Sequence, residues 1–83
     1  MKFKAEIDIM PLKALLDPQG KAVTSSLKNL ELSEIENVRI GKHISLEIEA
    51  DTEETAKGKV EEACKKLLAN HLMESYEFEL EAI

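Results

Sequence analysis

The sequence predicts a single α+β domain in which strands and helices follow the order β-α-β-β-α-β. A chain of 83 residues is long enough to build only one core. Apolar and polar residues alternate in four short segments, which is the two-residue period of a strand with one wet face. In two other segments, residues that commonly cap helices are followed by apolar residues at helical spacing.

The first strand and the first helix occupy the N-terminal third. Alternation over residues 3–9 predicts a strand that ends before Pro11, and residues 12–16 are interpreted as a loop. A helix then begins at Asp17, whose carboxylate can cap free amides, and Pro18 suits its first position. The apolar side of this helix consists of Ala22, Val23, Leu27 and Leu30.

A hairpin is expected in the middle of the chain. Residues 38–40 begin an alternation that resumes over residues 44–50. Gly41 and Lys42 lie between the two runs, and a glycine there favours a tight turn.

The second helix and the last strand complete the order. Asp51 or Thr52 can cap the helix, and acidic residues follow at its positive end. Gly58 interrupts the helix at a cost of about 1 kcal/mol relative to Ala, and Asn70 is expected to end it in a left-handed conformation. Residues 76–82 then alternate with glutamates as a fourth strand. The predicted buried stripe of the helix is Ala56, Val60, Ala63, Cys64, Leu67 and Leu68.

A four-stranded antiparallel sheet with both helices on one face buries all of these stripes, which is the ferredoxin-like arrangement. One such domain is expected to span residues 1–83. Regular strands of this kind have edges that can pair with a second subunit, so self-association is the preferred interpretation. The other face of the sheet would show Lys4, Glu6, Asp8, Ser45, Glu47, Glu49, Glu77, Glu79 and Glu81.

Composition excludes several classes of partner. The net charge is -6, Arg39 is the only arginine and there is no Trp, which argues against a nucleic-acid partner. No apolar stretch approaches the length that spans a membrane. The single Cys64 cannot form an internal disulfide, and a carboxylate precedes any apolar run at the N-terminus, so we expect a cytoplasmic protein.

No catalytic constellation is visible in the sequence. His43 lies beside the predicted turn and His71 follows the second helix, and with Cys64 they lack the closely spaced pairs of zinc sites. Gly20, in Asp17-Pro18-Gln19-Gly20, matches no phosphate-binding loop. We therefore expect that this chain has no catalytic residue and binds neither a metal ion nor a cofactor.

Two polar segments are nevertheless unusual. Residues 17–23 place Gly20 in the first turn of a helix, where Gly normally weakens it, and residues 38–42 place Arg39 and Lys42 at a tight turn. Turn chemistry and solubility are one explanation. The preferred hypothesis is that both segments form a docking surface, because loops at element ends carry recognition.

Several motifs, which together cover essentially the whole chain, carry a family resemblance. They are Leu16-Asp17-Pro18-Gln19-Gly20, Ala22-Val23, Val38-Arg39-Ile40-Gly41-Lys42, Cys64, Leu67-Leu68-Ala69-Asn70, Glu74, Tyr76 and Glu77. In this order and spacing they resemble the PurS family, the small subunit of phosphoribosylformylglycinamidine synthase in purine biosynthesis. The sequence departs from the family at Gly58, at His71-Leu72-Met73, and in the approach to Asp17, which is one residue shorter.

The resemblance implies a subunit without catalytic activity of its own. It implies partners, a PurL-type synthetase and a PurQ-type glutaminase, which use ATP, magnesium and glutamine as parts of one ligase complex. It also implies a homodimer or homotetramer, and a bridging role that lets ammonia reach the synthetase. The residues expected at subunit interfaces are Asp17, Gln19, Gly20, Arg39, Gly41, Lys42, Asn70 and Tyr76.

Two alternatives use the same fold. An ACT-like regulatory domain would bind an amino acid at a dimer interface, but no glycine-bearing loop joins the first strand to the first helix here. A small acyl-phosphate hydrolase would need an arginine beside the loop after the first strand, whereas Arg39 lies on the second.

Overall fold

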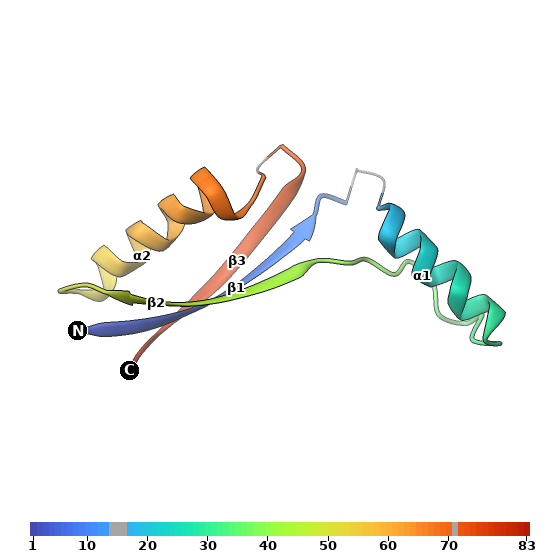
Figure 1. Cartoon of the computed structure of the whole chain (residues 1–83), viewed down its shortest axis with the longest axis horizontal. Coiled ribbons are helices and arrows are strands. Elements are labelled where there is room, and N and C mark those ends of the chain that lie inside the picture. The colour runs from blue at the N-terminus through green and yellow to red at the C-terminus, as the bar shows by residue number, and fades with distance from the viewer. Residues whose placement is uncertain (14–16, 71) are drawn as a thin grey trace.

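The computed structural model describes residues 1–13, 17–70 and 72–83 (Figure 1). The predicted loop over residues 12–16 therefore lies partly outside the described residues, and His71 lies wholly outside them. The elements are β1 (Lys2–Pro11), α1 (Pro18–Asn29), β2 (Lys42–Glu49), α2 (Glu53–Ala63), a π-helical turn η1 (Cys64–Leu68) and β3 (Glu74–Ala82).

The sheet is antiparallel, with the strand order β2-β1-β3. Central β1 sets the register, in which Ile7 lies opposite Ile44 on one side and Phe78 on the other. The α+β class and the antiparallel sheet are confirmed, but the prediction of four strands is wrong. Within the described residues the sheet has three strands, and residues 38–40 pair with none of them.

Residues 38–41 do not form a hairpin with β2. They lead directly into it as its extended continuation. Gly41 passes so close to the end of β1 that a Cβ on it would lie 2.4 Å from the carbonyl oxygen of Ile9. Val38 and Ile40 donate their amides to side chains at the start of α1. The segment is therefore extended, as its alternation predicts, but it is tied to α1 instead of to β2.

The core lies between the sheet and α2. Alternate residues of β1 are buried: Ala5, Ile7 and Ile9 pack with Val60 and Cys64, and Phe3 packs with Ala50 and Ala56. Burial stabilises each large apolar side chain of this set by about 1.5–3 kcal/mol. The helix begins where Thr52 accepts the amide of Thr55 at 3.1 Å, as the capping pattern predicts.

The end of α2 differs from its prediction. The helix widens at η1, where the amide of Ala69 donates to the carbonyl of Cys64 at 2.9 Å. This change of pitch turns Leu67 outward, so that 82% of it is exposed instead of buried. Asn70 does not adopt the predicted left-handed conformation; its side chain instead accepts the amide of Leu72 at 3.1 Å.

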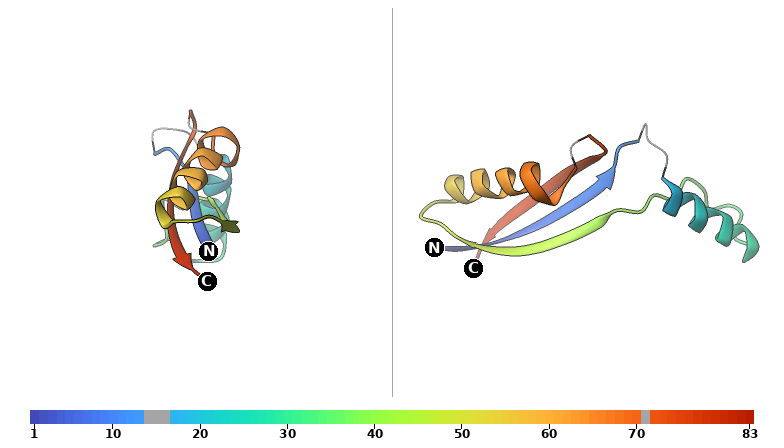
Figure 2. Two further views of the ribbon diagram at one scale, coloured as in Figure 1. Left: turned by 90° about the vertical axis from the view of Figure 1, so that its left-hand side faces the viewer. Right: turned by 45° about the horizontal axis from the view of Figure 1, so that its top comes forward.

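Helix α1 lies beyond the end of the sheet and not beside α2, so the expectation of two helices on one face is wrong (Figures 1 and 2). Residues 30–41 return along α1, with left-handed turns at Glu31 and Asn37. We call α1 and residues 30–41 the arm. It makes the molecule elongated, 52 × 26 × 14 Å, and only Gly20 is buried in α1.

None of the helices in the described part of the chain is long and apolar enough to cross a membrane.

Candidate subunit-contact surface

Asp17 ties the start of α1 to the extended segment that precedes β2. One carboxylate oxygen, Oδ1, accepts the amide of Gly20 at 3.0 Å and so caps the helix. The other, Oδ2, accepts the amide of Ile40 at 2.9 Å. Hydrogen bonds from Ile40 and then from Gly20 lower the pKa of the Asp17 carboxyl below its ordinary value.

Thr24 makes a second connection about two turns further along α1. Its hydroxyl donates to the carbonyl of Gly20 at 2.8 Å and accepts the amide of Val38 at 3.3 Å. The backbone is so close here that a Cβ on Gly20 would lie 2.1 Å from the carbonyl oxygen of Val38. The glycine in the first turn is thus required by the approach of residues 38–40 to the helix.

Sequence reasoning missed Thr24. A threonine inside a helix commonly donates its hydroxyl to the carbonyl four residues earlier, so the bond from Thr24 to Gly20 follows from the predicted helix. Nothing in the sequence pairs it with Val38, which is fourteen positions away.

Arg39 makes a hydrogen bond within its own chain. Its guanidinium donates through Nη2 to the carbonyl of Pro11, which joins the arm to the end of β1. Together with the two ties to α1, this contact fixes where the arm leaves the sheet. We call Pro11, Asp17, Gly20, Thr24 and residues 38–40 the elbow.

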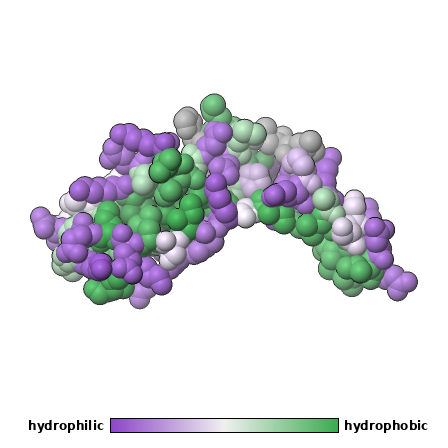
Figure 3. All heavy atoms as spheres, in the orientation of Figure 1, coloured by the Kyte–Doolittle hydropathy of each residue, from purple (hydrophilic) through white to green (hydrophobic). Residues whose placement is uncertain are grey.

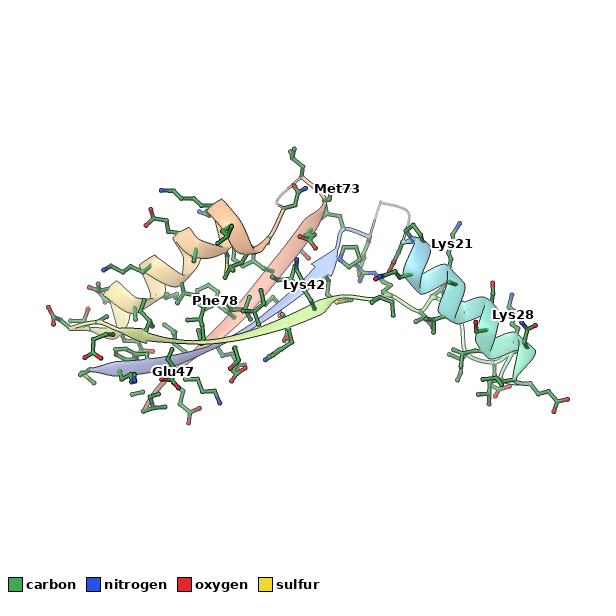
Figure 4. The ribbon with its side chains drawn as sticks, in the orientation of Figure 1. Lys21, Lys28, Lys42, Glu47, Met73 and Phe78 are labelled. Carbon is green, nitrogen blue, oxygen red and sulfur yellow. The ribbon has the colours of Figure 1, made fainter. Side chains whose placement is uncertain are left out.

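The other residues expected at interfaces lie around the elbow or near β3. Gln19, Gly41 and Lys42 are exposed at the elbow end of the sheet. Lys42, labelled in Figure 4, has its Nζ 3.8 Å from Glu74 Oε2. Glu74 Oε1 accepts the amide of Asn70 at 2.8 Å. Glu74 therefore brings Asn70 and Lys42 into one polar network.

Tyr76 is separate from that network. It is half-buried on the α2 side of the sheet, and its hydroxyl donates to Glu61 Oε1 at 3.1 Å. Burial raises the pKa of Tyr76, and the bond to Glu61 raises it further.

The arm carries an uncovered apolar surface, seen as green spheres along its length in Figure 3. The exposed fractions are 68% for Leu30, 41% for Ile35, 38% for Val23 and 37% for Leu32. These residues come from both branches of the arm, α1 and the returning segment.

The sheet face opposite α2 is strongly acidic, and we call it the acidic face. Glu6 and Asp8 on β1 lie directly opposite Glu79 and Glu77 on β3. His43 on β2 bridges the β1 pair, with Nδ1 2.6 Å from Asp8 Oδ1 and Nε2 2.5 Å from Glu6 Oε2. A shallow hollow of about 340 Å³ is lined by Glu6, Asp8, His43, Glu77, Phe78 and Glu79.

Both nitrogens of His43 can donate only when the ring is protonated. Its bonds to Asp8 and then Glu6 accordingly raise the pKa of His43. The same contact, with smaller contributions from Lys4 and Ser45, lowers the pKa of Glu6 to about 2. His43 therefore offsets part of the repulsion among the carboxylates of the acidic face.

The described residues contain no group of three His, Cys, Asp or Glu side chains that could hold a metal ion. Cys64 is free and buried, and burial raises the pKa of its thiol, which keeps it in the unreactive protonated form. The features that this part of the chain does present are an apolar arm, a polar elbow and an acidic face.

Residues 4–82 match the family PurS, described as Phosphoribosylformylglycinamidine (FGAM) synthase. The Phosphoribosylformylglycinamidine synthase subunit PurS of Bacillus subtilis is 37% identical over 81 residues, which is 98% of this chain and 95% of that protein. The subunit PurS of Synechocystis sp. is 44% identical over 70 residues, which is 84% of this chain and 70% of that protein.

Solved structures agree with these similarities. Bacillus subtilis PurS superposes with a TM-score of 0.87 at 38% identity, over 96% of this chain and 99% of that chain. A chain in the structure of PurLQS from Thermotoga maritima superposes with a TM-score of 0.88 at 33% identity, over 98% of this chain and 99% of that chain. The matches favour the subunit interpretation over the amino-acid-sensing alternative, and the chain belongs to the PurS family of phosphoribosylformylglycinamidine synthase subunits.

Proposed function

We propose that this chain is the PurS subunit of a phosphoribosylformylglycinamidine synthase complex and acts there as a non-catalytic bridge. Its partners are a PurL-type synthetase and a PurQ-type glutaminase. The observation that supports this most is the full-length similarity to a chain of PurLQS from Thermotoga maritima, with a TM-score of 0.88.

The surfaces of the chain suit a bridging role. The arm exposes apolar side chains from both of its branches, and the elbow places polar groups beside them. An apolar centre with a polar rim is the usual composition of a protein interface. ATP, magnesium and glutamine are then used by the partner subunits, and this chain needs to bind none of them.

A bridge matters because the complex must pass ammonia between active sites. Ammonia released into water at neutral pH is mostly protonated and no longer nucleophilic. A subunit that closes the joint between glutaminase and synthetase keeps ammonia unprotonated and close to its acceptor. The lone thiol of Cys64 suits a reducing compartment, so we place this work in the cytoplasm.

Self-association belongs to the same proposal. The apolar arm has no cover within the described residues, and the sheet has only one helix on its apolar face. A second copy of the chain, in a homodimer or homotetramer, covers the arm. The interface set Asp17, Gln19, Gly20, Arg39, Gly41, Lys42, Asn70 and Tyr76 then serves self-association and partner binding, partly by shaping the elbow.

The test is reconstitution with the PurL-type and PurQ-type subunits of the same organism. Formation of the amidine is measured with glutamine or with ammonium as the nitrogen source. We expect that glutamine-driven activity requires this chain and that ammonium-driven activity depends on it less. Unchanged glutamine-driven activity in its absence would overturn the proposal.

Two single substitutions that change the net charge equally sharpen the test. Gln19→Glu lies at the exposed start of α1, and Lys57→Gln lies on the exposed side of α2. We expect Gln19→Glu to weaken co-purification with the partner subunits and Lys57→Gln to leave it unchanged. Equal retention of partners by both variants would move the docking surface away from the elbow.

A further inference from the structure

The connection between α2 and β3 carries a second group of exposed apolar side chains. The exposed fractions are 82% for Leu67, 75% for Leu72 and 55% for Met73, so two of the three are more exposed than any apolar residue of the arm. Leu67 belongs to η1, and the other two directly precede β3. Figure 1 shows this connection at the end of the sheet from which the arm leaves. We call Leu67, Leu72 and Met73 the tip.

The backbone of the tip is held by its own hydrogen bonds. The Asn70 side chain accepts the amide of Leu72, and the Asn70 carbonyl accepts the amides of Met73 at 2.9 Å and Glu74 at 2.7 Å. The Met73 carbonyl in turn accepts the amide of Leu12 at 2.9 Å, just beyond the paired residues of β1. Because this turn is already ordered, a partner that covers it loses little affinity to the ordering of the backbone.

The exposure of Leu67 depends on η1. A regular α-helix would keep Leu67 on the same side as Val60 and Cys64, which are buried. The wider turn of η1 takes it out of that stripe. Turns of the π type are rare and are frequently found at functional sites. Here the turn enlarges the apolar surface of the connection, which favours a contact function for the tip.

Two lysines flank the tip. Lys65 is exposed in η1, two positions before Leu67. Lys13 is exposed directly after Leu12, whose amide bonds to the tip. Neither lysine belongs to an ion pair within the described residues. In a chain of net charge -6, this local positive charge fits a partner surface that carries carboxylates around an apolar pocket.

We infer that the tip docks into an apolar pocket with a carboxylate-bearing rim on the glutaminase subunit. This inference rests on the proposed function and specifies the surface that meets one of the two partners. The synthetase acts on substrates that carry phosphates, and a protein that holds phosphates needs positive charge. The lysines beside the tip suit such a protein poorly. The glutaminase acts on glutamine, which has no net charge, and its surface is free of that requirement.

Titration of the glutaminase into fixed amounts of the synthetase and this chain tests the inference, with amidine formation from glutamine as the readout. Leu72→Asn is compared with Ile83→Asn, a similar change at an exposed residue of the C-terminus, which Figure 1 marks at the other end of the sheet. We expect Leu72→Asn to raise the half-saturating glutaminase concentration at least about tenfold over Ile83→Asn, because a leucine buried at an interface contributes that much to affinity. Amidine formation from ammonium should be equal in the two variants, since it does not use the glutaminase.

The outcomes separate this inference from the proposed function. Equal half-saturating concentrations for the two variants would overturn the inference and leave the proposed function standing. If Leu72→Asn also lowers ammonium-driven activity, the tip meets the synthetase, and if it weakens self-association in sedimentation, the tip meets a second copy. Either result overturns the inference. Glutamine-driven activity that needs no wild-type chain would instead overturn the proposed function itself.

A second pair of variants tests the charge of the rim. Lys65→Gln and Lys57→Gln each remove one positive charge from an exposed position, the first in η1 and the second in α2. We expect Lys65→Gln to raise the half-saturating glutaminase concentration about threefold or more at low salt, with a smaller effect at high salt, and Lys57→Gln to leave it unchanged. Equal values for the two lysine variants would overturn the carboxylate rim of the inferred pocket.

Discussion

The same substitution at two glycines should have opposite effects on stability. Replacing Gly by Ala inside a helix ordinarily stabilises by about 0.5–1 kcal/mol, because Gly loses more backbone freedom on folding. At Gly58 a new Cβ meets nothing within 4 Å, so Gly58→Ala should show this full gain. At Gly20 it would lie 2.1 Å from the Val38 carbonyl oxygen and 2.8 Å from Asp17 Oδ2.

The contact at Gly20 is with backbone, which cannot swing aside as a flexible side chain can. Relieving such an overlap costs about 1–3 kcal/mol. The upper part of that range applies because the backbone of residues 38–40 must move away from α1. Subtracting the helical gain leaves a net destabilisation of about 1–2 kcal/mol for Gly20→Ala.

Urea unfolding of the wild type, Gly20→Ala and Gly58→Ala at one protein concentration measures both effects, since oligomerisation makes stability concentration-dependent. Stabilisation by Gly20→Ala similar to that by Gly58→Ala would refute the close approach of residues 38–40 to α1.

Further measurements probe the titrating and buried groups. The raised pKa of His43 means that its contribution to stability is fully present below its ordinary value of 6.5 and is lost as the pH rises through the folded-state value. The wild type should therefore lose stability relative to His43→Gln from about pH 6.5 upward, and parallel pH profiles of the two in urea unfolding would contradict the bridge. The pKa of Asp17 is lowered from 3.8, so the stability that it contributes is present above that value and is lost at more acid pH. In an NMR titration the amide shift of Ile40 should follow Asp17 with a midpoint below 3.8, and an ordinary midpoint would remove Asp17 from the elbow. Cys64 is fully buried, so a thiol reagent should label it only when the chain opens, and Gly58→Ala should slow the labelling. Labelling of the folded chain as fast as a free thiol would contradict that burial.

Much of the fold follows from local pattern. The alternation in β1 identified Phe3, Ala5, Ile7 and Ile9 as core, and the capping residues Asp17 and Thr52 marked both helix starts. These features depend on interactions between residues a few positions apart, so the local sequence pattern is enough to predict them.

Most of the errors concern relations between distant segments, and the others arise where the helix pitch changes at the end of α2. Residues 38–40 have the alternation of a strand and are extended, but their amides bind α1. Leu27 and Leu30 have the spacing of a buried stripe, but the pattern does not say which surface covers it. Leu67 continues the period of α2 up to the point where η1 changes the pitch. The candidate contact residues were found by their polarity at element ends, whereas their roles in the elbow depend on pairings that polarity does not encode.

The opposed carboxylates of the acidic face limit the ways in which copies of this chain can stack. A bare sheet face of apolar residues would invite another sheet to lie flat against it. Here Glu6 faces Glu79 and Asp8 faces Glu77, so two such faces brought together would press unbalanced negative charge within a Debye length of about 10 Å at 0.1 M salt. Face-to-face stacking of sheets is therefore disfavoured. The edges of the sheet and the arm remain for assembly, and there a closed symmetric complex of fixed size can form.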